Sequence, residues 1–124
     1  MELISLLRAR FNSEEVLDDC VFCKIVAGEI PAKLVKESQH CVAFQDIAPR
    51  APIHILVVPK AHHANIAELA AADAEALVDL MRLGSEVADT FSTGSFRFTF
   101  NTGAAAGQTV FHAHGHITSV TPKE

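Results

Sequence analysis

The chain has 124 residues, which is enough for one domain with a single hydrophobic core. Hydrophobic residues make up 49% of it and the mean hydropathy is +0.24, which excludes a disordered chain. The net charge is −5 without any cluster of Lys and Arg, so DNA and RNA are not expected as partners, although backbone N–H groups can still hold the phosphate of a single nucleotide.

The first residues and the cysteine count predict where the protein is found. The opening MELISLLRARFNSEEV has its arginines after a short apolar run and lacks a small-residue cleavage site, so we expect no signal peptide. No segment approaches the roughly 18 apolar residues that a membrane span needs. Three cysteines, an odd number, argue against a secreted disulfide scaffold. The sequence therefore predicts a cytoplasmic protein that does not enter a membrane.

The N-terminal part is predicted to be helical. Residues 1–19 are expected to form an N-terminal helical arm, because leucines recur on one side of it, and residues 20–124 a single domain. The domain opens with FCKIVAGEIP (22–31), which predicts one or two helical turns ended by a glycine and a proline.

Three strand-length runs follow this short helix. AKLVKES (32–38) and CVAFQDI (41–47) are separated by a polar break, which is typical of a hairpin. APIHILVVPK (51–60) is rich in β-branched residues and bounded by prolines, so it predicts a buried strand.

A helical region is predicted from Asn65 onward. The Asn65 side chain can cap the helix, with Glu68 three residues later completing the signal. Asp73 divides the region into a short and a long helix. One apolar stripe at helical spacing runs along it: Ile66, Leu69, Leu77, Leu80, Met81, Gly84, Val87 and Phe91.

The last third of the chain predicts two more strands. SFRFTFN (95–101) alternates, with its phenylalanines on one face, NTGAAAGQ (101–108) is a glycine-containing loop, and TVFHAHGHITSV (109–120) is the final strand. Five strands with short connections, one long helix and a short N-terminal helix predict an α+β fold with a five-stranded antiparallel sheet.

Three histidines alternate along the final predicted strand. At about 3.3 Å per residue, His112, His114 and His116 would project from one face at intervals of about 7 Å. An imidazole can attack phosphorus, donate a proton or bind a metal. From periodicity alone, the row could also be a polar solvent face of an edge strand or a simple metal-chelating row.

The loop before the histidines favours phosphate binding. Gly103 and Gly107 permit backbone conformations in which N–H groups converge on an anion. Gln108 and Thr109 add side-chain donors directly before the first histidine. Such a loop is usually only a turn, but beside three histidines a phosphate cradle is the better explanation.

GQTVFHAHGHI resembles the signature of the histidine triad family of nucleotide-binding proteins. The similarity extends through CVFCKIVAGEIPAKLVKES, CVAFQDIAPRAPIHILVVPKAH and FNTGAAAGQT, so that it covers residues 20–117. The match is strongest to small Hint-like proteins, which act on purine nucleoside phosphoramidates and related adenylates. The resemblance also implies a homodimer, for which the SFRFTF strand and the long helix offer surfaces.

The resemblance implies roles for the residues around the phosphate. His114, the middle histidine, would attack the α-phosphorus of a nucleoside monophosphate derivative, and water would hydrolyse the nucleotidyl-histidine intermediate. His116, Gln108 and Thr109 would orient the phosphoryl oxygens or the leaving group. Asn101 and Gly107 would lie near the phosphate.

The resemblance also implies a site for the nucleoside of an AMP-like purine nucleotide. Asp46 matches the acidic residue that accepts hydrogen bonds from the ribose hydroxyls, and His54 matches a further histidine of the pocket. Apolar positions around the base are matched by Phe22, Ile30, Phe44 and Ile47. Without the family, these apolar residues would be assigned to the core and Asp46 to a turn.

Cys20 and Cys23 leave a redox pair, a metal site or chance open. An antiparallel pattern does not provide the βαβ setting of a redox pair, and zinc needs two more ligands. Zinc-containing bacterial members of the family complete the set with histidines that match His62 and His112, which implies a structural zinc. His40 and His63 are then expected at the surface, and Cys41 in a buried strand.

Three functions remain open from the sequence. The first is hydrolysis of adenosine phosphoramidates or similar mixed phosphates, with hydrolysis of dinucleoside polyphosphates as its alternative. The second is a non-catalytic nucleotide-binding or scaffold protein, and the third is a small zinc module. The intact His114, Asn101 and Gln108 favour the first over the second. Gly115 stands where relatives commonly have a bulky apolar residue, which predicts weaker packing there.

Overall fold

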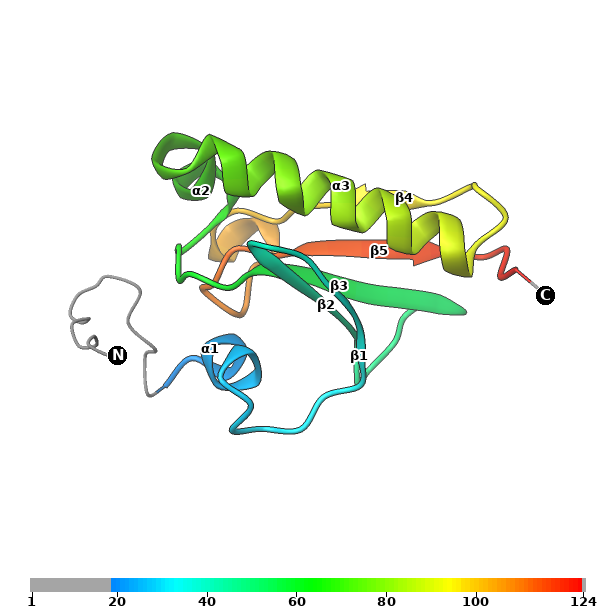
Figure 1. The fold of residues 1–124 in the computed structure, drawn as a ribbon, viewed down its shortest axis with the longest axis horizontal. Helices are drawn as coiled ribbons and strands as arrows, with labels where there is room; N and C mark the ends of the chain where they lie inside the picture. The colour runs from blue at the N-terminus through cyan, green and yellow to red at the C-terminus, as the bar shows by residue number, and fades with distance from the viewer. Residues whose placement is uncertain (1–18, 124) are drawn as a thin grey trace.

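The computed structural model describes residues 19–123, so the predicted arm at residues 1–19 lies almost entirely outside the described residues. Within these residues, three α-helices, five strands and one 3-10 turn follow one another (Figure 1). In chain order they are α1 (Val21–Val26), β1 (Leu34–Glu37), β2 (Cys41–Gln45), β3 (Ile53–Pro59), α2 (Ile66–Ala72), α3 (Ala74–Phe91), β4 (Arg97–Thr99), the 3-10 turn η1 (Ala104–Ala106) and β5 (Gly115–Ser119).

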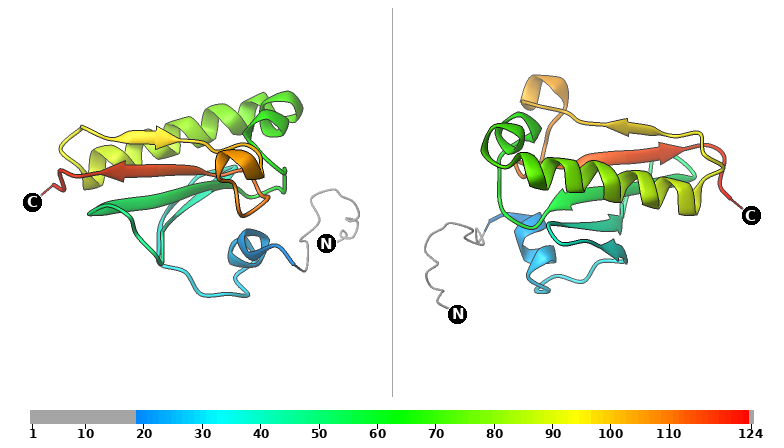
Figure 2. Two further views of the ribbon diagram at one scale, coloured as in Figure 1. Left: turned by 180° about the vertical axis from the view of Figure 1, so that it is seen from behind. Right: turned by 45° about the horizontal axis from the view of Figure 1, so that its top comes forward.

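The five strands form one sheet in the order β1-β2-β3-β5-β4, and every neighbouring pair is antiparallel. The α+β prediction is therefore confirmed. The long helix α3 lies across one face of this sheet and α1 lies on the other side (Figures 1 and 2).

Alternation along β3 divides the interior into two cores. Ile55 and Val57 point to the face covered by α3, where they join Leu80, Leu83 and other buried residues of α2 and α3. Leu56 and Val58 point to the opposite face and pack with Phe22, Phe44 and the cysteines of α1. This second, smaller core separates the sheet from α1.

The predicted cap at Asn65 is confirmed, and Asp73, predicted to divide the helical region, is also a helix cap. The Asn65 side chain accepts a hydrogen bond from the Glu68 N–H at 2.9 Å, and the Asp73 side chain accepts one from the Ala76 N–H at 3.0 Å. Asp73 thus separates α2 from α3, as the sequence predicted. Among residues 19–123, no helix is both long and apolar enough to cross a bilayer.

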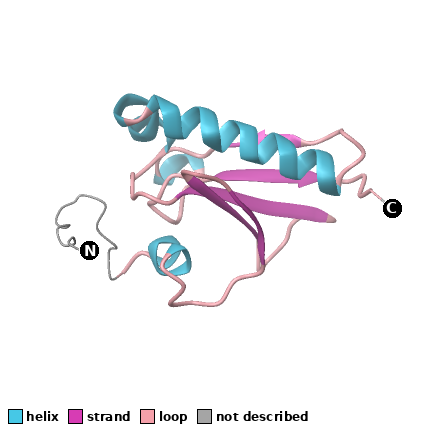
Figure 3. Cartoon of the chain, viewed as in Figure 1, coloured by secondary structure: helices cyan, strands magenta, loops and turns pink. Residues whose placement is uncertain are grey.

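The prediction that one strand covers residues 109–120 was wrong at its start, because β5 begins only at Gly115 (Figure 3). The β3–β5 ladder begins at the pair Val57–Gly115, and two residues later β3 ends at Pro59, which has no N–H to donate. The Ala113 N–H instead donates to the His63 carbonyl at 2.6 Å. His112 and His114 therefore lie in an irregular segment before the strand.

Phe98 of β4 fills the space that two glycines leave open. A Cβ placed on Gly84 of α3 would lie 2.3 Å from the Phe98 ring, and one on Gly115 of β5 would also lie 2.3 Å from it. The ring of Phe100 stacks on Phe98 with centroids 4.8 Å apart, whereas Phe96 is 39% exposed. The missing side chain at Gly115 is thus replaced by phenylalanine rings, and the expectation of weaker packing there was wrong.

Gly115→Ala is expected to lower the free energy of unfolding by about 1–3 kcal/mol, because the new methyl group would overlap both phenylalanine rings. Urea unfolding measures this. As control, Gly115→Ala combined with Phe98→Leu is expected to lose less stability than the two single variants together, since the smaller side chain makes room. An alanine variant as stable as the parent would contradict the packing described here.

Candidate active site

A continuous line of aromatic rings lies on the α1 side of the sheet. The ring centroids of His62 and His112 are 4.9 Å apart, Phe22 follows at 5.9 Å from His112, and His114 lies 5.0 Å from Phe22. His116 continues the line at 5.0 Å from His114, and His54 ends it at 5.2 Å from His116. The three histidines of the motif therefore lie in one line, with Phe22 between His112 and His114, although only His116 belongs to β5.

His114 has a defined tautomer. Its Nδ1 lies 2.7 Å from the His112 carbonyl oxygen, which can only accept, so Nδ1–H donates and Nε2 keeps a lone pair. This Nε2 has no hydrogen-bond partner among residues 19–123. Burial lowers the pKa of His114, opposed in part by the bond to His112 and by Asp46. A neutral imidazole with a free Nε2 lone pair is a nucleophile.

His116, His54 and Asp46 form a polar group next to His114. His54 Nε2 lies 3.0 Å from His116 Nδ1 and 3.4 Å from Asp46 Oδ2. His54 Nδ1 accepts a hydrogen bond from the Arg50 N–H at 3.0 Å, and Asp46 Oδ1 accepts one from the Ala48 N–H at 2.8 Å. Burial, and then the neighbouring His114 and His54, lower the pKa of His116 to about 4.

The glycine loop has the backbone that its sequence predicted. Gly103 and Gly107 have φ values of 90° and 97°, which favour glycine. The N–H groups of Ala106, Gly107 and Gln108 are bonded within the loop, so fewer of them are free for an anion than the glycine pattern suggested. Asn101 borders the loop, since its Nδ2 would lie 3.8 Å from a Cβ on Gly107. Thr109, next to this loop, is exposed.

Gln108 is a structural link in this arrangement. Its Oε1 accepts from the Gly103 N–H at 2.8 Å, and its Nε2 donates to the carbonyl oxygens of Ala64 at 2.8 Å and Val110 at 3.0 Å. Both amide protons are therefore used, and the side chain is buried. Donation from Gln108 to a phosphate stays a prediction, and it would break one of these bonds.

The apolar residues expected around the base occupy different environments. Phe22 and Phe44 are buried in the smaller core, in an edge-to-face contact at 5.6 Å. Ile30 is half-buried, whereas Ile47 is 97% exposed beside Asp46. Ile47 is thus the apolar side chain of this set that is open to a ligand.

Two cysteines and two histidines gather at the other end of the line. His112 Nδ1 lies 3.4 Å from Cys20 Sγ, 3.5 Å from Cys23 Sγ and 3.2 Å from His62 Nδ1. Cys23 Sγ lies 3.3 Å from His62 Nδ1. All four donor atoms lie within 4.8 Å of one another. The four residues are therefore positioned to hold a metal ion.

The chemistry of this cluster fits a metal. Four ligands at ordinary Zn–S and Zn–N distances in a tetrahedron have donor atoms about 3.3–3.8 Å apart, close to the separations found. His112 Nε2–H donates to the Pro59 carbonyl at 2.8 Å, so its Nδ1 lone pair faces the thiols. Burial lowers the pKa of His112 to about 4 and lowers that of His62, which keeps both rings neutral.

Asp46, His54 and His116 are also close enough to hold an ion, but their hydrogen bonds do not fit one. Since His54 Nδ1 accepts the Arg50 N–H, the proton of a neutral His54 is on Nε2. A metal on that Nε2 would require the doubly deprotonated imidazolate. Of the two groups, the cysteine-containing cluster is therefore the one whose chemistry fits a metal ion.

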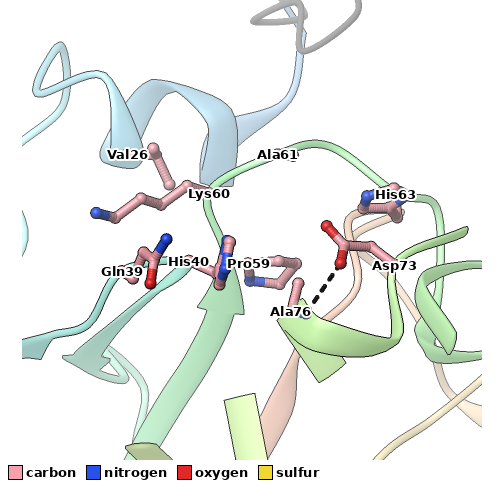
Figure 4. A pocket seen from close by; sticks show the side chains of 9 residues that line it. All are labelled: Val26, Gln39, His40, Pro59, Lys60, Ala61, His63, Asp73 and Ala76. Atoms are coloured by element: carbon pink, nitrogen blue, oxygen red, sulfur yellow. Dashed lines mark hydrogen bonds between the residues drawn. The ribbon is translucent and has the colours of Figure 1, made fainter. Parts of the chain in front are cut away.

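His40 and His63 are not simple surface residues as expected, since both are half-buried and His40 Nε2 is buried without a partner. They line a cavity of about 350 Å³ between α1, the β1–β2 turn and the start of α3, where Asp73 bonds to Ala76 (Figure 4). No histidine of the motif lines it. Cys41 is buried as predicted, and burial raises the pKa of its thiol to about 12.

Comparison with known proteins gives consistent matches. A family model described as "Scavenger mRNA decapping enzyme C-term binding" matches residues 19–124. An uncharacterised HIT-like protein of Synechococcus elongatus is 45% identical over 81% of this chain and 89% of its own length. Protein HitA of Neisseria gonorrhoeae is 43% identical over 82% of this chain and 95% of its own length.

Solved structures agree with the sequence matches. A HIT family hydrolase from Clostridium thermocellum superposes with a TM-score of 0.77 at 40% identity, over 82% of this chain and 90% of the other. A histidine triad protein from Clostridium difficile gives a TM-score of 0.76 at 35% identity, over 87% of this chain and 93% of the other.

Proposed function

The chain belongs to the histidine triad (HIT) family, and on that basis we propose that it is a nucleotidyl hydrolase that cleaves purine nucleoside phosphoramidates or related adenylates. The observation that supports this most is the His114 tautomer. Its Nδ1–H is held by the His112 carbonyl at 2.7 Å, which leaves the Nε2 lone pair free beside His116. A buried neutral imidazole in this state is prepared for attack on phosphorus.

The reaction has two displacements at one phosphorus. His114 Nε2 attacks the α-phosphorus, a new P–N bond forms, and the bond to the leaving amine breaks. The electron pair goes to the amine, which takes a proton from water. The hydrogen bond from Nδ1 to the His112 carbonyl stabilises the positive charge that develops on the ring. Water then attacks the nucleotidyl-histidine, and the nucleoside monophosphate and neutral His114 are released.

The proposed nucleotide lies between two segments: the connection from β2 to β3 and the glycine loop. Ile47 borders the base, with Phe22 and Phe44 supporting the wall behind it. Asp46 accepts hydrogen bonds from the ribose hydroxyls through its Oδ2. The phosphate lies beside His114, where Thr109, His116, Asn101 and Gly107 are its neighbours.

The metal is proposed to be zinc, in a structural role with all four positions closed by Cys20, Cys23, His62 and His112. When bound, zinc would tie α1 to the segment before β5. This matters for His114, because the carbonyl that fixes its tautomer belongs to the ligand residue His112. The chain's own bonds from Ala113 to His63 and from Gln108 to Ala64 support the same segment.

A cytoplasmic homodimer is proposed. Val78 and Met81 on the outer side of α3 and Phe96 before β4 are large apolar side chains exposed by about two-fifths, and β4 is an edge strand. Such a surface is typical of an interface. Light scattering after size exclusion is expected to give twice the chain mass, and a monomer at micromolar concentration would contradict the proposal.

The substrate class is tested by incubation with adenosine 5′-phosphoramidate, a guanosine analogue and diadenosine polyphosphates, followed by product chromatography. Release of the nucleoside monophosphate from the phosphoramidates is the expected result. Cleavage of the polyphosphates alone would identify a dinucleoside polyphosphate hydrolase. Nucleotide binding without any product would identify a non-catalytic binding or scaffold protein.

A further inference from the structure

His54 lies between the backbone amide of Arg50 and His116, in a chain of two hydrogen bonds. The first bond defines which atom donates in the second. The Arg50 N–H donates to His54 Nδ1 at 3.0 Å. A ring nitrogen that accepts a hydrogen bond has no proton of its own, so the proton of neutral His54 is on Nε2. The backbone therefore selects the tautomer of His54.

The same direction continues into His116. His54 Nε2 and His116 Nδ1 are 3.0 Å apart, and since His54 Nε2 has the proton, it donates and His116 Nδ1 accepts. The proton of neutral His116 is then on its Nε2. This Nε2 has no hydrogen-bond partner within the described residues, and the ring lies against that of His114. The chain of bonds thus ends in a free N–H beside the nucleophile.

Asp46 favours the same arrangement. Its Oδ2 lies 3.4 Å from His54 Nε2, where a lone pair would be repelled by the carboxylate and an N–H is attracted. Its Oδ1 accepts the Ala48 N–H, which holds the carboxylate in place. His54 is only 8% exposed, so little water competes for these bonds.

We propose that His54 is a positioning residue. The Arg50 N–H fixes the tautomer of His54, and, in this relay, the hydrogen bond that His54 Nε2–H then donates keeps His116 as an Nε2–H donor to a phosphoryl oxygen of the substrate. His54 acts through His116 and not on the nucleotide. The N–H of a neutral imidazole is too weak an acid to serve as a general acid. His116 therefore contributes a hydrogen bond to the negative charge that develops on the phosphoryl oxygen. The phosphoryl oxygen as acceptor rests on the proposed function, whereas the direction of the hydrogen bonds from Arg50 to His116 does not.

Nuclear magnetic resonance of the substrate-free full chain, with 15N-labelled histidine, locates the protons directly. The 15N shifts are expected to place the proton on Nε2 in both His54 and His116. A scalar coupling through the hydrogen bond is expected between His54 Nε2 and His116 Nδ1. A proton on Nδ1 of either ring, or the absence of that coupling, would overturn the relay.

Two variants of His54 separate the relay from packing. In His54→Gln the amide oxygen can accept from Arg50 while the amide nitrogen donates to His116, whereas His54→Leu only fills the space. For the leucine variant we expect kcat to fall by about tenfold or more with KM changed less than about threefold, and the glutamine variant to keep most of the parent kcat. Equal losses in both variants would overturn the proposal.

Thr118→Ala is the matched control, because Thr118 pairs with His54 across the β3–β5 ladder and takes no part in the chain of bonds. Its kcat is expected to equal that of the parent, and a loss equal to that of His54→Leu would make the effect one of packing and overturn the relay. If the parent releases no nucleotide from any phosphoramidate, the proposed function fails, while the resonance measurement still decides whether His54 directs His116.

Discussion

His114→Ala is expected to lower kcat for adenosine 5′-phosphoramidate by at least about 1,000-fold, while the Kd for AMP changes less than about threefold. The reason is that the substitution removes the Nε2 lone pair that forms the bond to phosphorus, whereas the base and ribose contacts lie elsewhere. Because the His114 ring also packs 5.0 Å from Phe22, His114→Gln is the companion variant that retains volume. Steady-state kinetics and calorimetry measure the two quantities.

His63→Ala is the control for these variants, because its imidazole lines the separate cavity and only its backbone carbonyl holds Ala113. It is expected to keep the parent kcat. If both His114 variants turned over substrate as fast as the parent, the nucleophile would be another group. If both lost AMP binding together with turnover, the ring would serve the nucleotide site and not the bond to phosphorus.

Cys20→Ser is expected to reduce bound zinc from about one per chain to near zero and to lower the free energy of unfolding by roughly 3 kcal/mol or more. A hydroxyl is a poor zinc ligand, and the remaining donors would be left close together without a central charge. In a chain of this size that loss corresponds to a fall in Tm of about 10 °C or more. Elemental analysis and thermal unfolding measure the two effects.

The matched control is Cys41→Ala, which removes a buried thiol that belongs to the other core of the domain and not to the cluster. Cys41 Sγ lies 3.7 Å from the Ala76 carbonyl and belongs to the core beneath α3. We expect this variant to retain the zinc content of the parent and to lose stability only through packing. Absence of zinc from the parent, or retention of zinc in Cys20→Ser, would refute the metal assignment.

Patterns within single elements predicted most of the fold. The strand-length run CVAFQDI, set off by a polar break, predicted β2, and the β-branched run APIHILVVPK predicted β3, because both strands are built from short apolar runs that end in the core. Asn65 and Asp73 gave the helix starts, because capping is a local interaction. These signals operate within a few residues, so one sequence contains them in full.

The start of β5 depended on a distant residue. The alternation of histidines continues through residues 112–116, but pairing stops where β3 ends at Pro59, more than fifty positions earlier in the chain. No local pattern contains that register. Because the residues before Gly115 are not held in the sheet, His112 can approach Cys20 and Cys23 at the start of α1 while His116 remains in β5.

The sequence predicted which residues form the candidate site, but not their tautomers or hydrogen-bond partners. The cysteine and histidine set followed from a resemblance, and the structure brings all four donor atoms together. The partners that fix each ring are backbone groups of Pro59, His112 and Arg50, which leave no trace in the sequence. For the same reason Gln108 was expected at the phosphate, although three backbone groups occupy its amide.

Phe98 determines which side chains fit at two other positions, 84 and 115. Its ring occupies the volume that side chains at 84 and 115 would need, so a larger residue at either glycine overlaps an aromatic ring at position 98. A lineage with a bulky residue at 115 must therefore have a smaller one at 98, and an intermediate with both would fold poorly. The order of substitution is thereby constrained, because the rings at 98 and 100 both have to yield before a bulky side chain fits at 115. Paired exchange at these sites, one on each of two neighbouring strands, would be the record of that constraint among homologous sequences.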